Sequence, residues 1–208
     1  MRSSTVRNVG EGAADNSARL HILNIQDGSI LDGDADVVVA VLENCVYMEE
    51  LVLYLDGERH SSTRTFPEES GELIGGTFSI QTYWYQNTQH WLEVADNLGN
   101  TQTRSVIFQN VISEVDLRSS LDMEPPGDTE FPYHIGALLS PPQSWRVELV
   151  GNDDALVMHS VGYGDHIRID WDGTATTGEV ATGAPYQVAM AALESGVTIV
   201  VGFINQLT

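Results

Sequence analysis

Short runs in which apolar and polar side chains alternate constrain the fold of this chain more than any other feature. The clearest run, His166–Trp171, places Ile167, Ile169 and Trp171 on one side and three polar residues on the other. Since successive side chains of a β-strand point to opposite faces, this alternation indicates a strand with one buried face. No window has the 3.6-residue period of a long amphipathic helix, although Leu117–Met123 could form one helical turn. The sequence therefore predicts an all-β protein.

Runs of this kind occur in both halves of the chain and are separated by turn residues such as Asp, Asn and Gly. In the first half they are Leu20–Ile25, Asp36–Leu42, Leu51–Asp56, Thr77–Tyr85, His90–Ala95 and Thr103–Phe108. In the second half they are Tyr133–Leu139, Trp145–Val150, Ala155–Ser160, His166–Trp171, Tyr186–Leu193 and Val197–Phe203. Short strands at this spacing are typical of β-sandwiches, so we expect two tandem immunoglobulin-like sandwiches.

A stretch with little periodicity separates the two sets of runs. Residues 116–132 are rich in Asp, Ser and Glu and contain the pair Pro125-Pro126 and Gly127. Such a composition is typical of a linker or a long crossover between domains. We therefore predict a flexible N-terminal segment at 1–18, one sandwich at 19–113, a linker at 114–130 and a second sandwich at 131–208.

Acidic residues greatly outnumber basic ones. Thirty Asp and Glu face nine Arg, there is no Lys, and the net charge is -21. This balance argues against nucleic acid and against anionic lipid as partners, because both are bound by clustered basic residues. No apolar stretch is long enough for a transmembrane helix. The charge could serve solubility in salt or collect divalent cations, and the sequence leaves both readings open.

The segment Ile169–Thr174 reads Ile-Asp-Trp-Asp-Gly-Thr, and it is followed by Gly178 and by Gly183–Val188. These residues resemble the immunoglobulin-like domain of the flagellar hook-capping protein family. The family pattern is a strand that ends in Trp-Asp-Gly, then a glycine-containing loop, then a glycine just before the Tyr that opens the next strand. The resemblance covers roughly residues 130–205. One departure is the insertion of Ala184-Pro185 before Tyr186.

Five residues carry this motif, and we expect each of them to make the fold. They are Trp171, Asp172, Gly173, Gly183 and Tyr186. Trp171 is expected to anchor the core, Asp172-Gly173 to make a tight turn, and Gly183 to supply a positive φ.

Residues 20–112 resemble the bacterial immunoglobulin-like repeats of surface and secreted proteins. The matching pieces are Asp27-Gly28, Leu53–Gly57, the strand start His90-Trp91-Leu92, and Ala95–Asn100. The resemblance implies structural roles for them, namely hairpin turns and a His that opens a strand after a bend. The family's Asn-Gly before this His is replaced by Asn87-Thr88-Gln89. Both resemblances imply an extracellular or cell-surface location, although residues 1–18 lack the apolar region of a signal peptide.

Catalytic motifs are missing from the sequence. The six His are scattered without metal-ligand spacing, and no G-x-S-x-G occurs. Cys45, the single cysteine, reads as a small buried hydrophobe. We therefore predict no catalytic residue and no enzyme. An enzyme with a site spread over loops would need a concave polar pocket that holds a His–carboxylate pair.

Three carboxylates at alternate positions, Asp32, Asp34 and Asp36, are the candidate metal site. This is the spacing with which the start of a calcium loop offers its oxygen ligands. The alternative is an acidic turn that leads into the following strand. Ca²⁺ is the one cofactor that the sequence suggests.

Tyr83, Tyr85 and Trp91 are the candidate binding surface. An outward aromatic patch near Gln86–Gln89 could hold a sugar ring or form a protein interface. The alternative is that these rings are buried or cover a junction between domains.

The last run, Val197–Ile204, is apolar on both faces. A strand of this kind must be covered on both sides. It is either a final core strand against a neighbouring domain, or a strand added to the sheet of a second subunit in an oligomer or filament. The expected partner is accordingly a protein, including a second copy of the chain.

The function expected from these features is a non-catalytic structural or adhesive tandem that mediates protein contact or assembly at the cell surface or in a filament. The alternative is a carbohydrate-binding accessory module of a secreted hydrolase or protease. That alternative requires Tyr83, Tyr85 and Trp91 to be exposed and coplanar.

Overall fold

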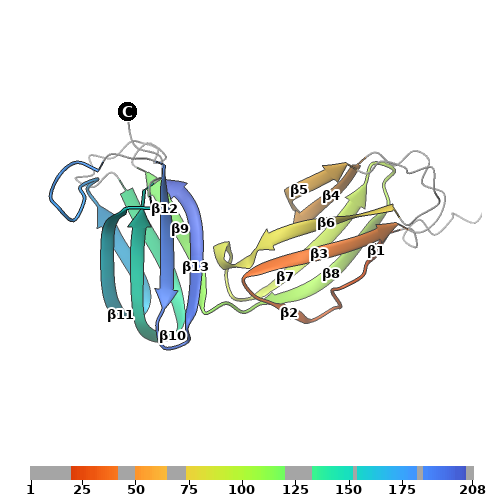
Figure 1. Cartoon of the computed structure of the whole chain (residues 1–208). Helices are drawn as coiled ribbons and strands as arrows, with labels where there is room; N and C mark the ends of the chain where they lie inside the picture. Colours follow the sequence, from red (N-terminus) through yellow and green to blue (C-terminus); the bar gives the residue numbers. More distant parts are fainter. Residues whose placement is uncertain are drawn as a thin grey trace, which may run out of the picture. The chain divides into compact units, whose positions relative to one another are not determined.

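The computed structural model describes residues 20–41, 50–64, 74–119, 133–151, 154–181 and 185–204, most of them in strands (Figure 1). Cys45, Gly183, the segment 1–18 and residues 120–130 of the predicted linker lie outside these ranges. The predicted fold class, all-β with immunoglobulin-like sandwiches, is confirmed. Among the described residues the single helix is a 3-10 turn, η2 (Thr82–Trp84). None of the helical structure in this part of the chain could cross a membrane.

Two compact units make up the chain. The first comprises Met1–Gly28, Asp36–Phe78 and His90–Val106, and the second comprises Ser29–Ala35, Ser79–Gln89 and Ile107–Thr208. This division differs from the predicted boundaries, because Ser29–Ala35 and Ser79–Gln89 group with the C-terminal residues. The predicted linker also differs, since its first residues belong to a strand, β9 (Ile112–Ser119), that pairs with the C-terminal sheet.

Eight strands precede β9. They are β1 (Leu20–Ile22), β2 (Ser29–Leu31), β3 (Asp34–Val41), β4 (Glu50–Leu55), β5 (Glu58–Arg64), β6 (Ile74–Gln81), β7 (Gln89–Asp96) and β8 (Thr101–Phe108). They form one sheet in the order β1-β3-β6 and another in the order β2-β8-β7-β4-β5. Leu51, Leu53 and Leu55 of β4 and Leu92 and Val94 of β7 are buried at alternate positions. The apolar positions of the alternation are therefore the residues on the buried face of each strand.

The turn between β4 and β5 is fixed by Asp56. Asp56 and Gly57 both have positive φ, 52° and 84°, as a two-residue hairpin turn of the favoured hand requires. The Asp56 carboxylate accepts a hydrogen bond from the Trp91 backbone N–H at 2.8 Å and lies 2.6 Å from His90 Nδ1. The Asp56 N–H donates to the Trp91 carbonyl at 2.9 Å. His90 therefore ties the start of β7 to the β4–β5 turn.

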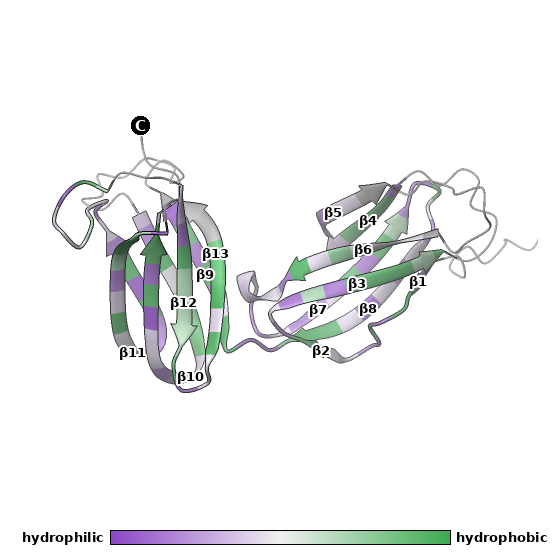
Figure 2. Cartoon of the chain, in the orientation of Figure 1, coloured by the Kyte–Doolittle hydropathy of each residue, from purple (hydrophilic) through white to green (hydrophobic). Residues whose placement is uncertain are grey.

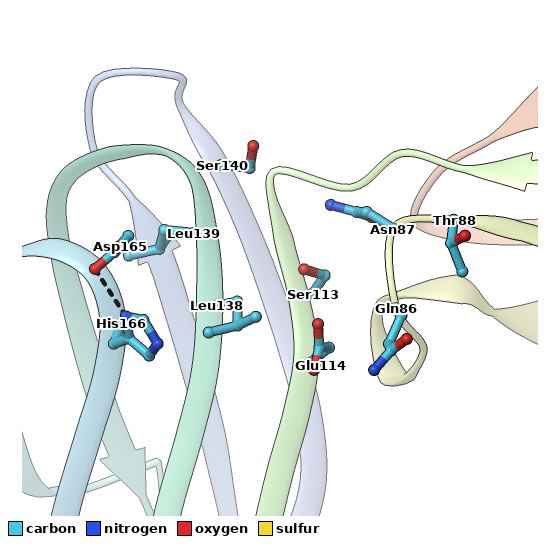
Figure 3. A pocket seen from close by; sticks show the side chains of 10 residues that line it. All are labelled: Gln86, Asn87, Thr88, Ser113, Glu114, Leu138, Leu139, Ser140, Asp165 and His166. Atoms are coloured by element: carbon cyan, nitrogen blue, oxygen red, sulfur yellow. Dashed lines mark hydrogen bonds and ion pairs between the residues drawn. The ribbon is translucent and has the colours of Figure 1, made fainter.

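The C-terminal sandwich consists of β9 and four further strands. These are β10 (Tyr133–Val150), β11 (Leu156–Trp171), β12 (Tyr186–Ala192) and β13 (Val197–Ile204). Their order is β11-β10-β12-β13, and β9 pairs with β10. The first part of β10 pairs with β9 and with the end of β11, whereas its second part pairs with β12 and with the start of β11. The register shifts between Leu138 and Gln143, where β10 turns over (Figure 3).

One core lies beneath all five strands. Apart from Gly136, which has no side chain, the buried residues of β10 are odd-numbered: Tyr133, Ile135, Ala137, Leu139, Gln143, Trp145, Val147 and Leu149. The even-numbered residues of this strand face outward. Gly162 of β11 lies against the Trp145 ring, and a Cβ at this position would come within 2.3 Å of Trp145 Cζ2. A glycine is therefore needed for Trp145 to pack in this core.

Trp171 lies at the centre of an aromatic group in the same core. Its ring centroid is 4.9 Å from that of Tyr133 and 5.5 Å from that of Tyr186, and its Nε1 donates to the Thr174 carbonyl at 2.7 Å. Gly173 has a φ of 84°. The turn at Asp172 and Gly173 leads into a short antiparallel bridge between Thr174 and Val180, and not directly into the next strand.

Candidate functional site

A buried polar network holds the loop that follows η2. Thr82 Oγ1 lies 2.8 Å from both Asn110 Oδ1 and the Gly33 carbonyl, and the Gly33 N–H donates to Asn110 Oδ1 at 2.8 Å. Asn87 Nδ2 donates to the Asn110 carbonyl at 2.8 Å, and the Asn110 N–H donates to Asn87 Oδ1 at 2.7 Å. Because each buried group is paired, the network is well suited to fix the loop at Asn87.

This loop lines one side of a polar hollow of about 420 Å³ within the second unit (Figure 3). Its lining residues are Gln86, Asn87, Thr88, Ser113, Glu114, Leu138, Leu139, Ser140, Asp165 and His166. Glu114 has a φ of 48°, so β9 carries a backbone irregularity at the edge of the hollow. Sequence reasoning does not predict this site, because its residues come from four separate segments.

The hollow holds a His–carboxylate pair, which is the feature that the hypothesis of an enzyme with a site spread over loops requires. His166 Nδ1 lies 2.7 Å from Asp165 Oδ1, and the hydrogen bond from His166 lowers the pKa of Asp165. Both side chains are largely exposed. In the described part of the chain no hydroxyl group is hydrogen-bonded to His166. The pair is therefore a solvated surface contact without the partnered nucleophile that acyl-transfer chemistry needs.

The predicted calcium site is not formed. Asp34 and Asp36 are exposed at alternate positions of β3, and Asp32 precedes the strand. Within the described ranges, no three His, Cys, Asp or Glu side chains come together in a way that could hold a metal ion. The physical reason is that an extended strand separates alternate residues by about 6.6 Å, whereas a calcium loop folds its ligands around one point.

The three rings of the predicted aromatic surface lie in different surroundings. Tyr83 is only 4% exposed and belongs to the core of the second unit, whereas Trp91 of β7 is 54% exposed. Tyr85 is half-buried, with its ring 5.8 Å from that of Phe108. Residues 82–84 wind into η2, so the alternation predicted for Thr77–Tyr85 ends at this point. Tyr83 thus follows the alternative in which the ring is buried, and it offers no outward surface to a ligand.

One outer face of the C-terminal sandwich is charged. We name as the charged face the outward side chains of β9, of the first part of β10 and of the second part of β11: Asp116, Arg118, His134, His166, Arg168 and Asp170. His134 Nδ1 lies 2.7 Å from Asp170 Oδ1, and Arg118 lies 2.6 Å from Asp116. Arg168 approaches Asp170 at 3.8 Å. Acids and bases on this face are thus paired with each other.

The other outer face is mainly apolar. We name as the apolar face the outward side chains Val161, Tyr163, Ala189, Leu193, Thr198 and Val200, from β11, β12, β13 and the turn after β12; Ala191 of β12 shares this face but is buried. The register of the strands makes them neighbours across the sheet, with Arg146 and Glu148 of β10 between them. Tyr163 is 76% exposed and Val161 is 64% exposed. Arg146 and Glu148 pair with each other at 3.3 Å.

β13 ends the sheet on the apolar face. In the strand order of the described residues it pairs with β12 alone. It contains neither a charged residue nor Pro, and it is drawn largely as an apolar strand in Figure 2. Val200 is 53% exposed. Among the described residues, the prediction that both faces of this strand are covered is not met, since Thr198 and Val200 are exposed.

No protein-family model matches the chain, and no curated protein matches it. Among solved structures it is similar to dimeric latent PorU from Porphyromonas gingivalis, at 16% identity and a TM-score of 0.35 over 96% of this chain and 21% of that one. It is also similar to the fibronectin(III)-like modules of Clostridium thermocellum CbhA, at 9% identity and a TM-score of 0.32 over 44% of this chain and 97% of that one. A third similar structure is DIP-gamma IG1+IG2, at 10% identity and a TM-score of 0.31 over 88% of this chain and 94% of that one.

The chain thus spans about a fifth of the length of PorU. Likenesses at these identities and TM-scores assign no function to it. The similarity of residues 130–205 to the hook-capping family remains a prediction from the motif around Trp171.

Proposed function

We propose that this chain is a non-catalytic structural module that assembles by pairing β13 with β13 of a second copy. The observation that carries this proposal is a strand without charge or proline that, among the described residues, is hydrogen-bonded to a neighbouring strand on one side only, and that borders a sheet face with exposed apolar side chains. The resemblance to immunoglobulin-like domains of surface and secreted proteins favours a place for this assembly at the cell surface.

An open edge strand presents unpaired N–H and C=O groups, and natural proteins protect such edges with charges, prolines or irregularities. The edges at β9 and at the second part of β11 follow that rule. β9 carries Glu114, Asp116 and Arg118, and β11 carries a series of charged residues and glycines after Val161. β13 lacks this protection, and this supports its use as a binding edge.

A second copy is the occupant that fits the charge of the strand. When an edge strand pairs with its own copy, every charge on that strand occurs twice along the new ladder, and like charges at opposed positions repel. β12 and β13 carry no charged residue in either strand, so the local cost is absent even though the chain carries a net charge of -21. The long-range repulsion remains, and salt screens it.

The non-catalytic part of the proposal rests on the polar hollow. Its Asp165–His166 pair is exposed and lacks a hydrogen-bonded hydroxyl in the described residues. The carbohydrate-binding alternative needed three exposed rings, and Tyr83 is buried.

Sedimentation velocity of the whole chain at increasing NaCl tests the proposal. We expect a dimer or larger species whose fraction increases with salt. Val200→Lys should yield a monomer, because it adds one cation from each copy to the pairing edge. Val161→Lys is the matched control, since it makes the same change at a similarly exposed valine on the opposite edge, and it should associate like the unchanged chain. A wild-type monomer at every salt concentration, or equal association of both variants, would refute the proposal.

A further inference from the structure

A second hollow, of about 300 Å³, lies at the end of the apolar face. It is lined by Pro141, Pro142, Gln143, Tyr163, Glu194 and Ser195. All six belong to the second unit. The prolines are exposed, and Tyr163 is the most exposed large apolar side chain in the described part of the chain. Exposed rings beside rigid prolines form a concave surface that the proposed pairing of β13 does not use.

The carboxylate in this hollow is held in place by one neighbour. Glu194 Oε2 accepts a hydrogen bond from the Ser144 N–H at 2.7 Å, and Glu194 Oε1 accepts one from Ser144 Oγ at 2.6 Å. The hydrogen bond from the Ser144 hydroxyl lowers the pKa of Glu194, so its carboxylate stays ionised at neutral and mildly acidic pH. Each carboxylate oxygen keeps a further lone pair for a ligand.

The strand register brings the Tyr163 ring to the same place. Tyr163 of β11 lies directly opposite Ser144 of β10, and side chains paired in this way are about 5 Å apart at Cβ. Tyr163 and the Glu194 carboxylate therefore flank a single residue. An aromatic ring face attracts cations, and a fixed carboxylate next to it adds an ion pair.

The remaining polar groups of the hollow are already satisfied. Gln143 Oε1 accepts from the Ser195 N–H at 3.0 Å and from Ser195 Oγ at 2.8 Å, and Gln143 Nε2 donates to the Pro141 carbonyl at 3.2 Å. Arg146, the nearest basic residue along β10, pairs with Glu148 at 3.3 Å. What the hollow leaves for a ligand is a ring face, a carboxylate and the apolar surface of two prolines.

We propose that this hollow binds an arginine side chain of a protein partner. The guanidinium stacks on the Tyr163 ring and pairs with Glu194, while its aliphatic stem lies along Pro141 and Pro142. A planar cation with an apolar stem complements this combination of surfaces better than a compact ammonium does. The net charge of -21 favours a basic partner over long range. This site is separate from the β13 edge, so either proposal can fail without the other.

The test is a titration of the whole chain with a capped pentapeptide that carries Arg between glycines, followed through the backbone NMR signals of Tyr163, Glu194 and Ser195. The same peptide with citrulline removes the charge and keeps the shape. We expect weak, millimolar binding in which Arg is favoured over citrulline by about fivefold or more. The affinity should fall as salt increases, opposite to the trend expected for β13 self-association.

Variants separate the two recognition elements. Tyr163→Ala should weaken arginine binding by about three- to fivefold, whereas Tyr163→Phe, which keeps the ring, should change it less than about twofold. Glu194→Gln should weaken binding to a similar extent and remove most of its salt dependence. Trp91→Ala and Glu179→Gln are the matched controls at exposed positions outside the hollow, and neither should alter the affinity.

Equal affinity for arginine and citrulline would overturn the proposal. So would a loss of affinity in Trp91→Ala equal to that in Tyr163→Ala, signal changes centred on β13, or no change at these three residues up to about 20 mM peptide.

Discussion

The two outer faces of the C-terminal sandwich are built over one core by the same long hairpin, β10–β11, yet they differ in chemistry. On the charged face, His134, Asp170 and Arg168 form contacts at 2.7 and 3.8 Å, and Arg118 pairs with Asp116. On the apolar face, Val161, Tyr163 and Val200 remain exposed. The charged face is satisfied within the chain, whereas the apolar face leaves surface for a partner.

This difference shows why a net charge is a poor guide to where a protein binds. A value of -21 describes the whole chain, but it is unevenly distributed. The strands β12 and β13 contain no charged residue, and they are the strands at the open edge. The average charge sets solubility and long-range repulsion, whereas the local composition of an edge strand sets what can pair with it.

The largest effect should follow from removing the core that both faces share. Trp171→Ala should lower the free energy of unfolding by about 3–5 kcal/mol, because it empties the space between Tyr133 and Tyr186. Denaturant unfolding followed by circular dichroism measures this. Trp91→Ala, at an exposed tryptophan, should cost less than about 0.5 kcal/mol. Similar losses in both variants would contradict the role of Trp171 as the anchor of both faces.

Two glycines, one beneath each face, give a matched comparison of packing. Gly162→Ala places a Cβ within 2.3 Å of the Trp145 ring and should cost about 1–3 kcal/mol. Gly136→Ala meets the His134 Nε2 atom at 3.1 Å, which a side chain on the charged face can relieve by a small rotation, so it should cost less than about 0.5 kcal/mol. Thermal and denaturant unfolding of both variants check the order. The reverse order would show that the charged face is the more tightly packed.

The ion pairs of the charged face should contribute little. Asp170→Asn removes the partner of both His134 and Arg168 and should destabilise by no more than about 1 kcal/mol, because these side chains are partly exposed. The loss should shrink further in high salt. A loss of several kcal/mol that is insensitive to salt would mean that this face holds the fold together.

The smallest effect concerns acid stability at the Asp172 turn, next to the charged face. Hydrogen bonds from Thr174 Oγ1 and from the Thr174 N–H lower the pKa of Asp172 from its ordinary 3.8. The ionised carboxylate therefore stabilises the fold above that value, and this contribution is lost as the pH falls through the lowered pKa. Asp172→Asn should flatten the acid limb of a stability-against-pH curve below about pH 4 and leave its slope near neutral pH unchanged. An acid limb that Asp172→Asn leaves unchanged would contradict the contribution of the ionised Asp172 carboxylate to stability.

The alternation of apolar residues was enough to predict most strands, and the places where it failed have local causes. Residues 114–119 of β9 fall within the predicted linker because the period of this strand slips: Ile112 and Ser113 are both buried, and Glu114 takes a positive φ beside a register shift in β10. β5 was missed because its sequence, from Glu58 to Arg64, carries no apolar alternation. The alternation predicts two strands in place of β10 and two in place of β11. The gap within each pair coincides with the point where the hairpin turns over, at the register shift after Leu138.

The site residues were harder to predict, because they depend on register and not on sequence spacing. Tyr163 and Glu194 are far apart in the sequence, and only the pairing of Tyr163 with Ser144 brings them together. The calcium and aromatic predictions rested on spacing alone. The extended strand separates Asp34 from Asp36, Asp32 lies before the strand, and the 3-10 turn buries Tyr83.

Amide hydrogen exchange of β13 measured at several protein concentrations tests the central claim most directly. If the open edge pairs with a second copy, protection of amides between Val197 and Val201 should increase with protein concentration and with salt, and Val200→Lys should abolish the increase. Amides of β9 and β11 should show no such trend. The claim that β13 pairs with a second copy would be contradicted if its amides were already fully protected in dilute solution. It would also be contradicted if their protection did not change with protein concentration.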